Sequence, residues 1–211
     1  MKPRQLTFLI AACFALVVPT VSEAGVVFTL GNNSSGDEEN VLLGSGTTGT
    51  TVFGATNTTN LTVQFTSTQT LNEPASGAAR IEATSGGSQV ALTDITISVP
   101  GGTFTDLIFN PTITGTIGTD GGTATVTVVA NDGTSSFDYS LGKGNNYLTI
   151  TTTSTTVIDS VNISYAPGFS DLRQIRISGA AVPEPSSIAI MAVGGAFAAT
   201  LGLRRGRRRA G

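Results

Sequence analysis

Residues 61–66, Leu-Thr-Val-Gln-Phe-Thr, alternate apolar and polar side chains. Successive side chains of a β-strand point to opposite faces, so a strand here places Leu61, Val63 and Phe65 on one apolar face. The same alternation, less regular, recurs in four further stretches: 124–130 (ATVTVVA), 147–153 (YLTITTT), 161–165 (VNISY) and 172–178 (LRQIRIS). This pattern is typical of half-buried strands in antiparallel sheets, and it predicts an all-β body.

Glycine-rich breaks separate these stretches, at 86–87, 100–102, 120–122, 131–133 and 143–145. Glycine and asparagine tolerate the positive φ angles that tight turns need. Threonine, which is β-branched and favours strands, supplies 31 of the 158 residues between 25 and 182. We therefore predict about ten to twelve strands, folded as one antiparallel β-sandwich or jelly-roll-like domain over residues 25–182.

This body is strongly acidic. Between residues 25 and 182 there are four basic side chains and twelve acidic ones, a formal net charge of −8, whereas the whole chain carries −3. Charged residues make up 12% of the chain, against about 25% in an average soluble domain. An acidic surface repels phosphate groups, so the composition argues against nucleic-acid binding.

Several catalytic chemistries need residues that this sequence lacks. It contains no His and a single Cys, Cys13, which excludes a His-dependent triad and the usual Cys/His zinc site. Paired carboxylates could still hydrolyse a glycoside, but no motif marks a pair among the twelve acids of the body. We expect no catalytic residues and no enzymatic activity, with a carboxylate-dependent hydrolase as the weaker alternative.

Residues 31–40, GNNSSGDEEN, gather Asp37, Glu38 and Glu39 among turn-forming residues. Clustered carboxylates suit calcium, but their spacing matches neither an EF-hand nor a calcium-binding repeat, so a solvated loop is the favoured interpretation. Four other acids could build a site only if the fold brings them together, and most of them are better explained as turn residues: Asp120, Asp132, Asp138 and Asp159. We predict no metal site and no cofactor.

Polysaccharide binding by the sandwich is the alternative function. Jelly rolls include carbohydrate-binding proteins, and such sites commonly use exposed aromatic side chains. The aromatic residues of the body are three tyrosines (Tyr139, Tyr147 and Tyr165) and seven phenylalanines. At period-two positions such as Phe65 and Phe137, a place in the core is the simpler expectation. An exposed row of Tyr or Phe on one concave face would favour binding.

Arg173 and Gln174, in the last predicted strand, admit two interpretations. They could belong to a binding site, or their polar side chains could protect the edge of a sheet from pairing with another chain. The protected edge is the simpler account.

Residues 1–24 have the layout of a secretory signal peptide. A basic start is followed by a 13-residue apolar run, 6–18 (LTFLIAACFALVV), and by the small residues Ser22 and Ala24. This order predicts export by the secretion machinery and cleavage by signal peptidase after Ala24. The apolar run is too short for a spanning helix, which needs about 20 residues.

Residues 183–211 predict a membrane anchor. Pro183-Glu184-Pro185 begins a stiff, extended tract, because proline restricts its own φ and the residue before it. Residues 188–203 carry no charge, and as a helix they rise about 24 Å, slightly less than a hydrocarbon core of about 30 Å. A basic tail, 204–209, supplies Arg204, Arg205, Arg207, Arg208 and Arg209. Positive charge beside a membrane helix remains in the cytoplasm, so the residues before Pro183 are expected outside.

A Pro-Glu-Pro tract, an apolar helix and a terminal arginine cluster, in this order, resemble the PEP-CTERM sorting domain of Gram-negative bacteria. The resemblance covers about the last 30 residues. It implies processing by exosortase, an integral-membrane transpeptidase of the Cys type, with Pro183, Glu184 and Pro185 as the recognition element. The helix would hold the substrate in the inner membrane transiently, and the arginines would act as the cytoplasmic stop.

The same resemblance implies a biofilm or exopolysaccharide setting, because the family is associated with bacteria that produce them. The expected protein is therefore exported and sorted to the cell surface or extracellular matrix. Its body would have a structural or interaction role, with exopolysaccharide as the partner that the alternative function requires.

Overall fold

A computed structural model describes residues 25–44, 46–74, 77–114 and 117–182 of the chain. The predicted signal peptide, 1–24, and the predicted sorting segment, 183–211, lie outside the described residues. Within the described part, no helix is long and apolar enough to cross a membrane.

The described residues form an all-β, antiparallel structure, which confirms the predicted all-β class, although their fifteen strands exceed the predicted ten to twelve because several are only two or three residues long. The strands are β1 (Val26–Leu30), β2 (Glu39–Leu43), β3 (Thr48–Thr56), β4 (Thr62–Asn72), β5 (Gly77–Ala78), β6 (Arg80–Ser85), β7 (Ser88–Val90), β8 (Leu92–Ser98), β9 (Asp106–Ile113), β10 (Thr123–Ala130), β11 (Gly133–Ser140), β12 (Gly144–Asn145), β13 (Leu148–Thr152), β14 (Ile158–Phe169) and β15 (Asp171–Ser178). The five stretches with alternating side chains coincide with β4, β10, β13, β14 and β15.

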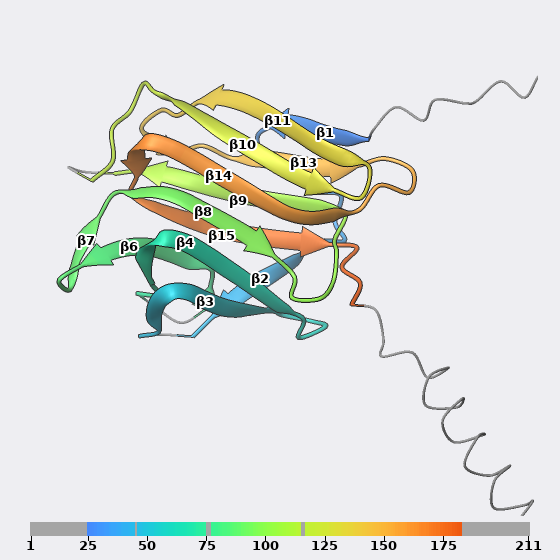
Figure 1. Ribbon diagram of the computed structural model, residues 1–211, viewed down its shortest axis with the longest axis horizontal. Helices are drawn as coiled ribbons and strands as arrows, with labels where there is room; N and C mark the ends of the chain where they lie inside the picture. The colour runs from blue at the N-terminus through green and yellow to red at the C-terminus, as the bar shows by residue number, and fades with distance from the viewer. Residues whose placement is uncertain (1–24, 45, 75–76, 115–116, 183–211) are drawn as a thin grey trace, which may run out of the picture.

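The strands are arranged as two facing layers (Figure 1). The front layer runs β3, β4, β8, β14, β10 and β11, and the layer behind it runs β2, β15, β9, β13 and β1. Strand β10 forms a hairpin with β11 around the break at 131–133, pairing Val126 with Phe137. The breaks at 86–87 and 131–133 therefore act as the turns that the sequence predicts, whereas Gly144 and Asn145 of the break at 143–145 form the short strand β12.

The two layers are joined along one side and open along the other. Strand β2 pairs with β15 in one sheet and with β3 in the other. Strand β6 likewise pairs with β15 and with β4. At the opposite side, β1 and β11 are the last strands of the path and are not hydrogen-bonded to each other in the described structure.

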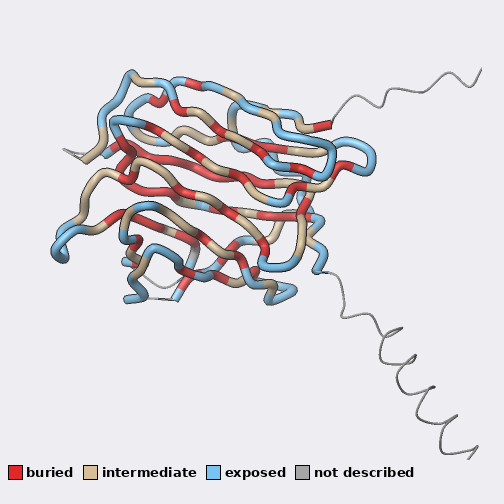
Figure 2. Tube along the Cα trace, in the orientation of Figure 1, coloured by how far each residue is buried: buried red, intermediate tan, exposed pale blue. Residues whose placement is uncertain are grey.

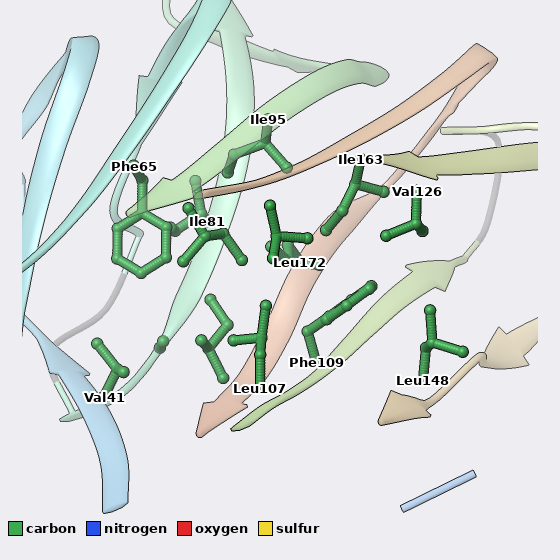
Figure 3. Packing of buried hydrophobic residues seen from close by; sticks show 14 of the residues in the cluster. Val41, Phe65, Ile81, Ile95, Leu107, Phe109, Val126, Leu148, Ile163 and Leu172 are labelled. Carbon is green, nitrogen blue, oxygen red and sulfur yellow. The ribbon is translucent and has the colours of Figure 1, made fainter. Parts of the chain in front are cut away.

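The hydrophobic core fills the space between the layers (Figures 2 and 3). Val63 and Phe65 on β4 are fully buried, as the alternation predicts, and Leu61 packs against the same core. Phe109 and Leu172 face them from the other sheet (Figure 3). Among the described residues, the buried members of this core all lie between residues 41 and 177, so residues 25–182 are expected to fold as a unit.

Replacing Phe65 with Ala should lower the free energy of unfolding by about 3–5 kcal/mol, because it leaves a cavity where a fully buried ring was. Urea denaturation of residues 25–182 measures this change. Phe53→Ala on the paired strand β3 is the matched control, since that ring is 52% exposed, and it should change stability by no more than about 0.5 kcal/mol. Equal losses in the two variants would contradict the placement of the core.

Candidate functional site

A cleft of about 300 Å³ lies at one end of the open side of the sandwich. Its lining comes from the ends of β1 and β11, from the last residue of β12 and from the segment between β12 and β13: Leu30, Gly31, Tyr139, Ser140, Asn145, Asn146 and Tyr147. This volume is at the lower end of the range for small-molecule sites, roughly 300–1,000 Å³. The lining contains two tyrosines, one hydroxyl and two side-chain amides, and no charged residue.

A row of stacked aromatic rings links β1 and β11 beside the cleft. The ring of Phe28 stacks on that of Phe137 with centroids 5.1 Å apart and an interplanar angle of 12°. Phe137 in turn stacks on Tyr139, with centroids 6.2 Å apart. Since these two strands share no backbone hydrogen bonds, ring stacking holds the open side together there. Phe137 is half-buried and packs against the core, whereas Tyr139 is one of the residues that line the cleft.

Tyr139 has a hydroxyl group with no hydrogen-bond partner among the described residues. The side chain is only 7% exposed, and this burial raises the pKa of the Tyr139 phenol, which therefore stays neutral. A buried hydroxyl without a partner costs free energy, and it is able both to donate and to accept a hydrogen bond.

Tyr147, on the other wall, is held by a network on the outer face of the rear sheet. Its hydroxyl donates to Oε1 of Gln174, which also accepts from Nδ2 of the fully buried Asn110 at 3.2 Å. Nδ2 of Asn110 also donates to Oδ1 of Asn145 at 2.9 Å, and its Oδ1 accepts from the backbone N–H of Asn146 at 2.7 Å. The buried Asn110 side chain thus positions Asn145 and Asn146 directly, and it positions Tyr147 through Gln174.

Gln174 reaches this network because β15 is irregular at that point. The register of β15 against β9 shifts between Arg173 and Arg176, and Gln174 has a φ of 52°. A left-handed backbone at a residue with a long side chain stores about 1–3 kcal/mol of strain, and it persists where surrounding contacts hold it. The hydrogen bonds to Asn110 and Tyr147 are such contacts.

The edge-strand interpretation of Arg173 and Gln174 is wrong, because β15 lies inside its sheet. It pairs with β9 on one side and with β2 and β6 on the other. Arg173 is instead part of an ion-pair cluster: its Nε donates to Oδ1 of the fully buried Asp171 at 2.6 Å. Nε of Arg80 lies 3.2 Å from Oδ2 of the same carboxylate, and Nη2 of Arg80 lies 3.3 Å from Glu82. The two arginines therefore balance the charge of the buried Asp171 carboxylate, whose role is structural.

The acidic loop before β2 provides hydrogen-bond donors for one of its own carboxylates, that of Glu38. Glu38 accepts hydrogen bonds from the Ser34 hydroxyl at 2.5 Å, the Ser35 backbone N–H at 2.7 Å and the Gly36 backbone N–H at 3.1 Å. Partial burial raises the pKa of Glu38, but the hydrogen bonds outweigh it and lower that pKa to about 2. Over the described residues, no group of three or more His, Cys, Asp or Glu side chains is placed to hold a metal ion.

The other acids singled out in the sequence are spread over separate turns and strands. Asp132 accepts from the Thr156 hydroxyl at 2.7 Å, and Asp138 from the Thr125 hydroxyl at 2.6 Å. Asp120 lies 4.0 Å from the Lys143 ammonium. The third tyrosine, Tyr165, is buried in the core.

The predicted sorting and cleavage residues all lie outside the described residues: Ser22, Ala24, Pro183, Glu184, Pro185, Arg204, Arg205, Arg207, Arg208 and Arg209.

The sequence did not predict five of the seven cleft residues as members of a binding site. Leu30 and Gly31 end a strand, Ser140 ends another, and Asn145 looks like an ordinary turn residue. They come from three segments separated by as much as about 110 residues, and no local motif joins them. The one signal in the sequence was the pair of tyrosines, Tyr139 and Tyr147.

Comparison with known families identifies the C-terminal segment. A family model described as the PEP-CTERM protein-sorting motif matches residues 181–209. The chain therefore carries this sorting motif, which confirms the resemblance drawn from Pro183-Glu184-Pro185, the apolar run and the arginines. A search of curated proteins finds no match.

Among solved structures, the chain is similar to three variants of the module CBM29-2, from work on ligand recognition by family 29 carbohydrate-binding modules. Each is 15% identical to this chain with a TM-score of 0.25. The alignments cover 73–74% of this chain and 89–90% of the modules. Because a TM-score of 0.25 does not establish a shared fold, nothing known of those modules is transferred to this protein.

A second buried acid, Glu73, lies just after β4 and is 1% exposed. Neither oxygen of its carboxyl group has a hydrogen-bond partner among the described residues. Burial raises the pKa of Glu73, and the nearby Thr47 hydroxyl, which does not reach hydrogen-bond geometry, offsets only part of that rise.

Glu73→Gln should gain stability relative to the natural chain as the pH rises from about 4 to about 7. Below its ordinary pKa of 4.5, the carboxyl is protonated in both the folded and unfolded states. Above it, the unfolded state ionises first, so the folded state of the natural chain loses stability. Denaturant unfolding across this pH range measures the difference, and a constant difference would contradict the raised pKa.

Glu38→Gln should show the opposite dependence. The lowered pKa of Glu38 stabilises the natural chain above pH 4.5, and this contribution is lost as the pH falls toward 2. The variant should therefore melt at a lower temperature than the natural chain at neutral pH, with the two melting temperatures converging near pH 2. A gap in melting temperature that widens on acidification would refute the loop geometry.

Proposed function

We propose that this protein is an exported component of the cell surface or extracellular matrix, delivered by exosortase through its C-terminal sorting motif. The observation that carries the proposal is the PEP-CTERM motif at residues 181–209. This motif implies recognition by exosortase and export to the cell surface. A body with twelve acidic and four basic side chains fits a soluble domain outside the cell.

In this proposal, each part of the segment 183–211 has a separate task. Pro183, Glu184 and Pro185 form a stiff tract that exosortase recognises outside the membrane. The apolar helix 188–203 holds the protein in the inner membrane until processing, and the basic tail 204–209 keeps it from sliding outward. The signal peptide 1–24 starts export, with cleavage after Ala24.

The body then has a structural or binding role rather than a catalytic one. A carboxylate-dependent hydrolase needs two acids beside a substrate-sized cleft. The cleft formed by the ends of β1 and β11 and by residues 145–147 is lined by no Asp or Glu in the described structure. That the protein is not an enzyme stays a prediction from its composition.

Polysaccharide binding by the sandwich is the second candidate function. The observation that favours it is the cleft itself, in which tyrosine rings and side-chain amides meet on one concave surface. Aromatic rings beside a few hydrogen-bonding groups are typical of small-molecule sites.

Replacing Pro183, Glu184 and Pro185 with Ala should leave an unprocessed, membrane-held protein, because exosortase loses its recognition element. Mass spectrometry of protein recovered from the membrane and the cell surface measures both terminal cuts. Ser186→Ala with Ser187→Ala is the matched control, and it should mature normally. Normal maturation of the Pro-Glu-Pro variant would reject the tract as the recognition element.

Deleting residues 188–211 should release the body into the medium, since the predicted anchor is removed. Fractionation of cells and medium, followed by immunoblotting, detects the release. Replacing the five arginines of 204–209 with Lys is the control, because it preserves the positive charge and should preserve the transient membrane form. Retention of the deletion variant on cells would count against the anchor.

A further inference from the structure

We propose that the cleft binds one short segment of a neutral saccharide, with Tyr147 as its stacking face and Asn145 and Ser140 as hydrogen-bonding partners. Asn110 and Gln174 act as positioning residues that hold this rim in place. The inference rests on the second candidate function, polysaccharide binding, and names its site and ligand class.

The chemistry of the walls matches the two-sided chemistry of a sugar ring. A sugar has apolar C–H faces and an edge of hydroxyl groups, so it suits an aromatic face next to amides and hydroxyls. Tyr147 is half-buried with its hydroxyl already engaged by Gln174, which leaves the ring as its binding surface. Leu30, 61% exposed, extends the apolar surface at the rim.

The polar groups of the lining divide into structural and available ones. Asn146 uses its side-chain Nδ2 to donate to the carbonyls of Pro111, Gly142 and Gly144, so it holds the loop. Asn145 and Ser140 are exposed, and neither the Asn145 Nδ2 nor the Ser140 hydroxyl is hydrogen-bonded within the described structure. The hydroxyl oxygen of Tyr139 is buried behind this wall and is not among the available groups.

The charge of the site selects a neutral ligand. None of the seven lining residues is charged, so no cation is present to pair with a uronate or sulfate group. Lys143, two residues from Asn145, is directed to Asp120 at 4.0 Å. The net charge of −8 over residues 25–182 further repels anionic chains. Neutral hydroxyls therefore fit the site better than acidic sugars.

The rim is fixed before any ligand arrives. The buried Asn110 amide bonds to Asn145, Asn146 and Gln174, and Gln174 bonds to Tyr147. A rigid rim loses less conformational entropy on binding, which favours affinity. The strained φ of 52° at Gln174 is consistent with a residue held for its side-chain position rather than for its backbone.

Affinity electrophoresis of residues 25–182 tests the proposal, with gels containing dextran, mannan, galactan or barley β-glucan as neutral probes and alginate or polygalacturonate as anionic ones. At least one neutral polysaccharide should retard the protein, and the anionic ones should not. Preference for an anionic polysaccharide would overturn the ligand class, and retardation by none would overturn both this inference and the second candidate function.

Tyr147→Ala should weaken binding to the retarding polysaccharide by about tenfold, the loss expected when one stacking face is removed. Phe53→Ala, an exposed aromatic on β3 far from the lining, is the control and should bind normally. Urea denaturation verifies that both variants fold. If the two variants bind equally well, this cleft is rejected while polysaccharide binding by another surface stands.

The variant Gln174→Gly distinguishes a role of Gln174 in positioning Tyr147 from a role in the stability of the fold. Glycine relieves the positive φ, so the variant should fold with little loss of stability. If Gln174 positions Tyr147, the affinity for the polysaccharide should still fall several-fold, whereas Arg176→Ala, a control on the same strand outside the lining, should leave it unchanged. Unchanged affinity in Gln174→Gly would refute the positioning role.

Discussion

The structure depends on burying one face of each sheet against the other. Strands with alternating threonine and aliphatic residues cannot hide their apolar side alone, so two sheets must face each other across a shared core. Strands β2 and β6 achieve this on one side by pairing with both sheets. The other side has no such shared strand, and stacked rings from Phe28 and Phe137 close it instead. The cleft lies where this closure ends.

Strand β9 departs from the alternating pattern and explains the polar network behind the cleft. Its outer-face residues Asn110 and Thr112 are buried like those of its inner face. Buried polar side chains need partners, and here they find them in neighbouring strands and loops. Thr112 donates to Asp171, and Asn110 joins Asn145 to Gln174. The need to satisfy one buried amide thus determines where Tyr147 and Asn145 lie.

The C-terminal segment and the body of the chain owe their proposed functions to different physical properties. The sorting motif at 181–209 depends on composition and order, which makes it readable without a fold. The body is almost uncharged on its cleft and acidic elsewhere, a combination suited to neutral partners outside the cell. The proposed activities are therefore independent: delivery belongs to the C-terminal segment, and binding belongs to the surface formed by the ends of β1 and β11 and by residues 145–147.

The sequence alone determined the all-β class, the position of five strands and the sorting motif. These are local properties: alternation along a strand places Val63 and Phe65 inside, and the order of proline, apolar and arginine residues requires no long-range contact. It also misplaced Arg173 at a sheet edge, because edge or interior depends on which strands become neighbours. Only the tertiary structure decided that, and only it brought residues 30–31, 139–140 and 145–147 together. The reason is that strand order and the bulge at Gln174 arise from pairing between distant segments, which leaves no periodic trace in any one of them.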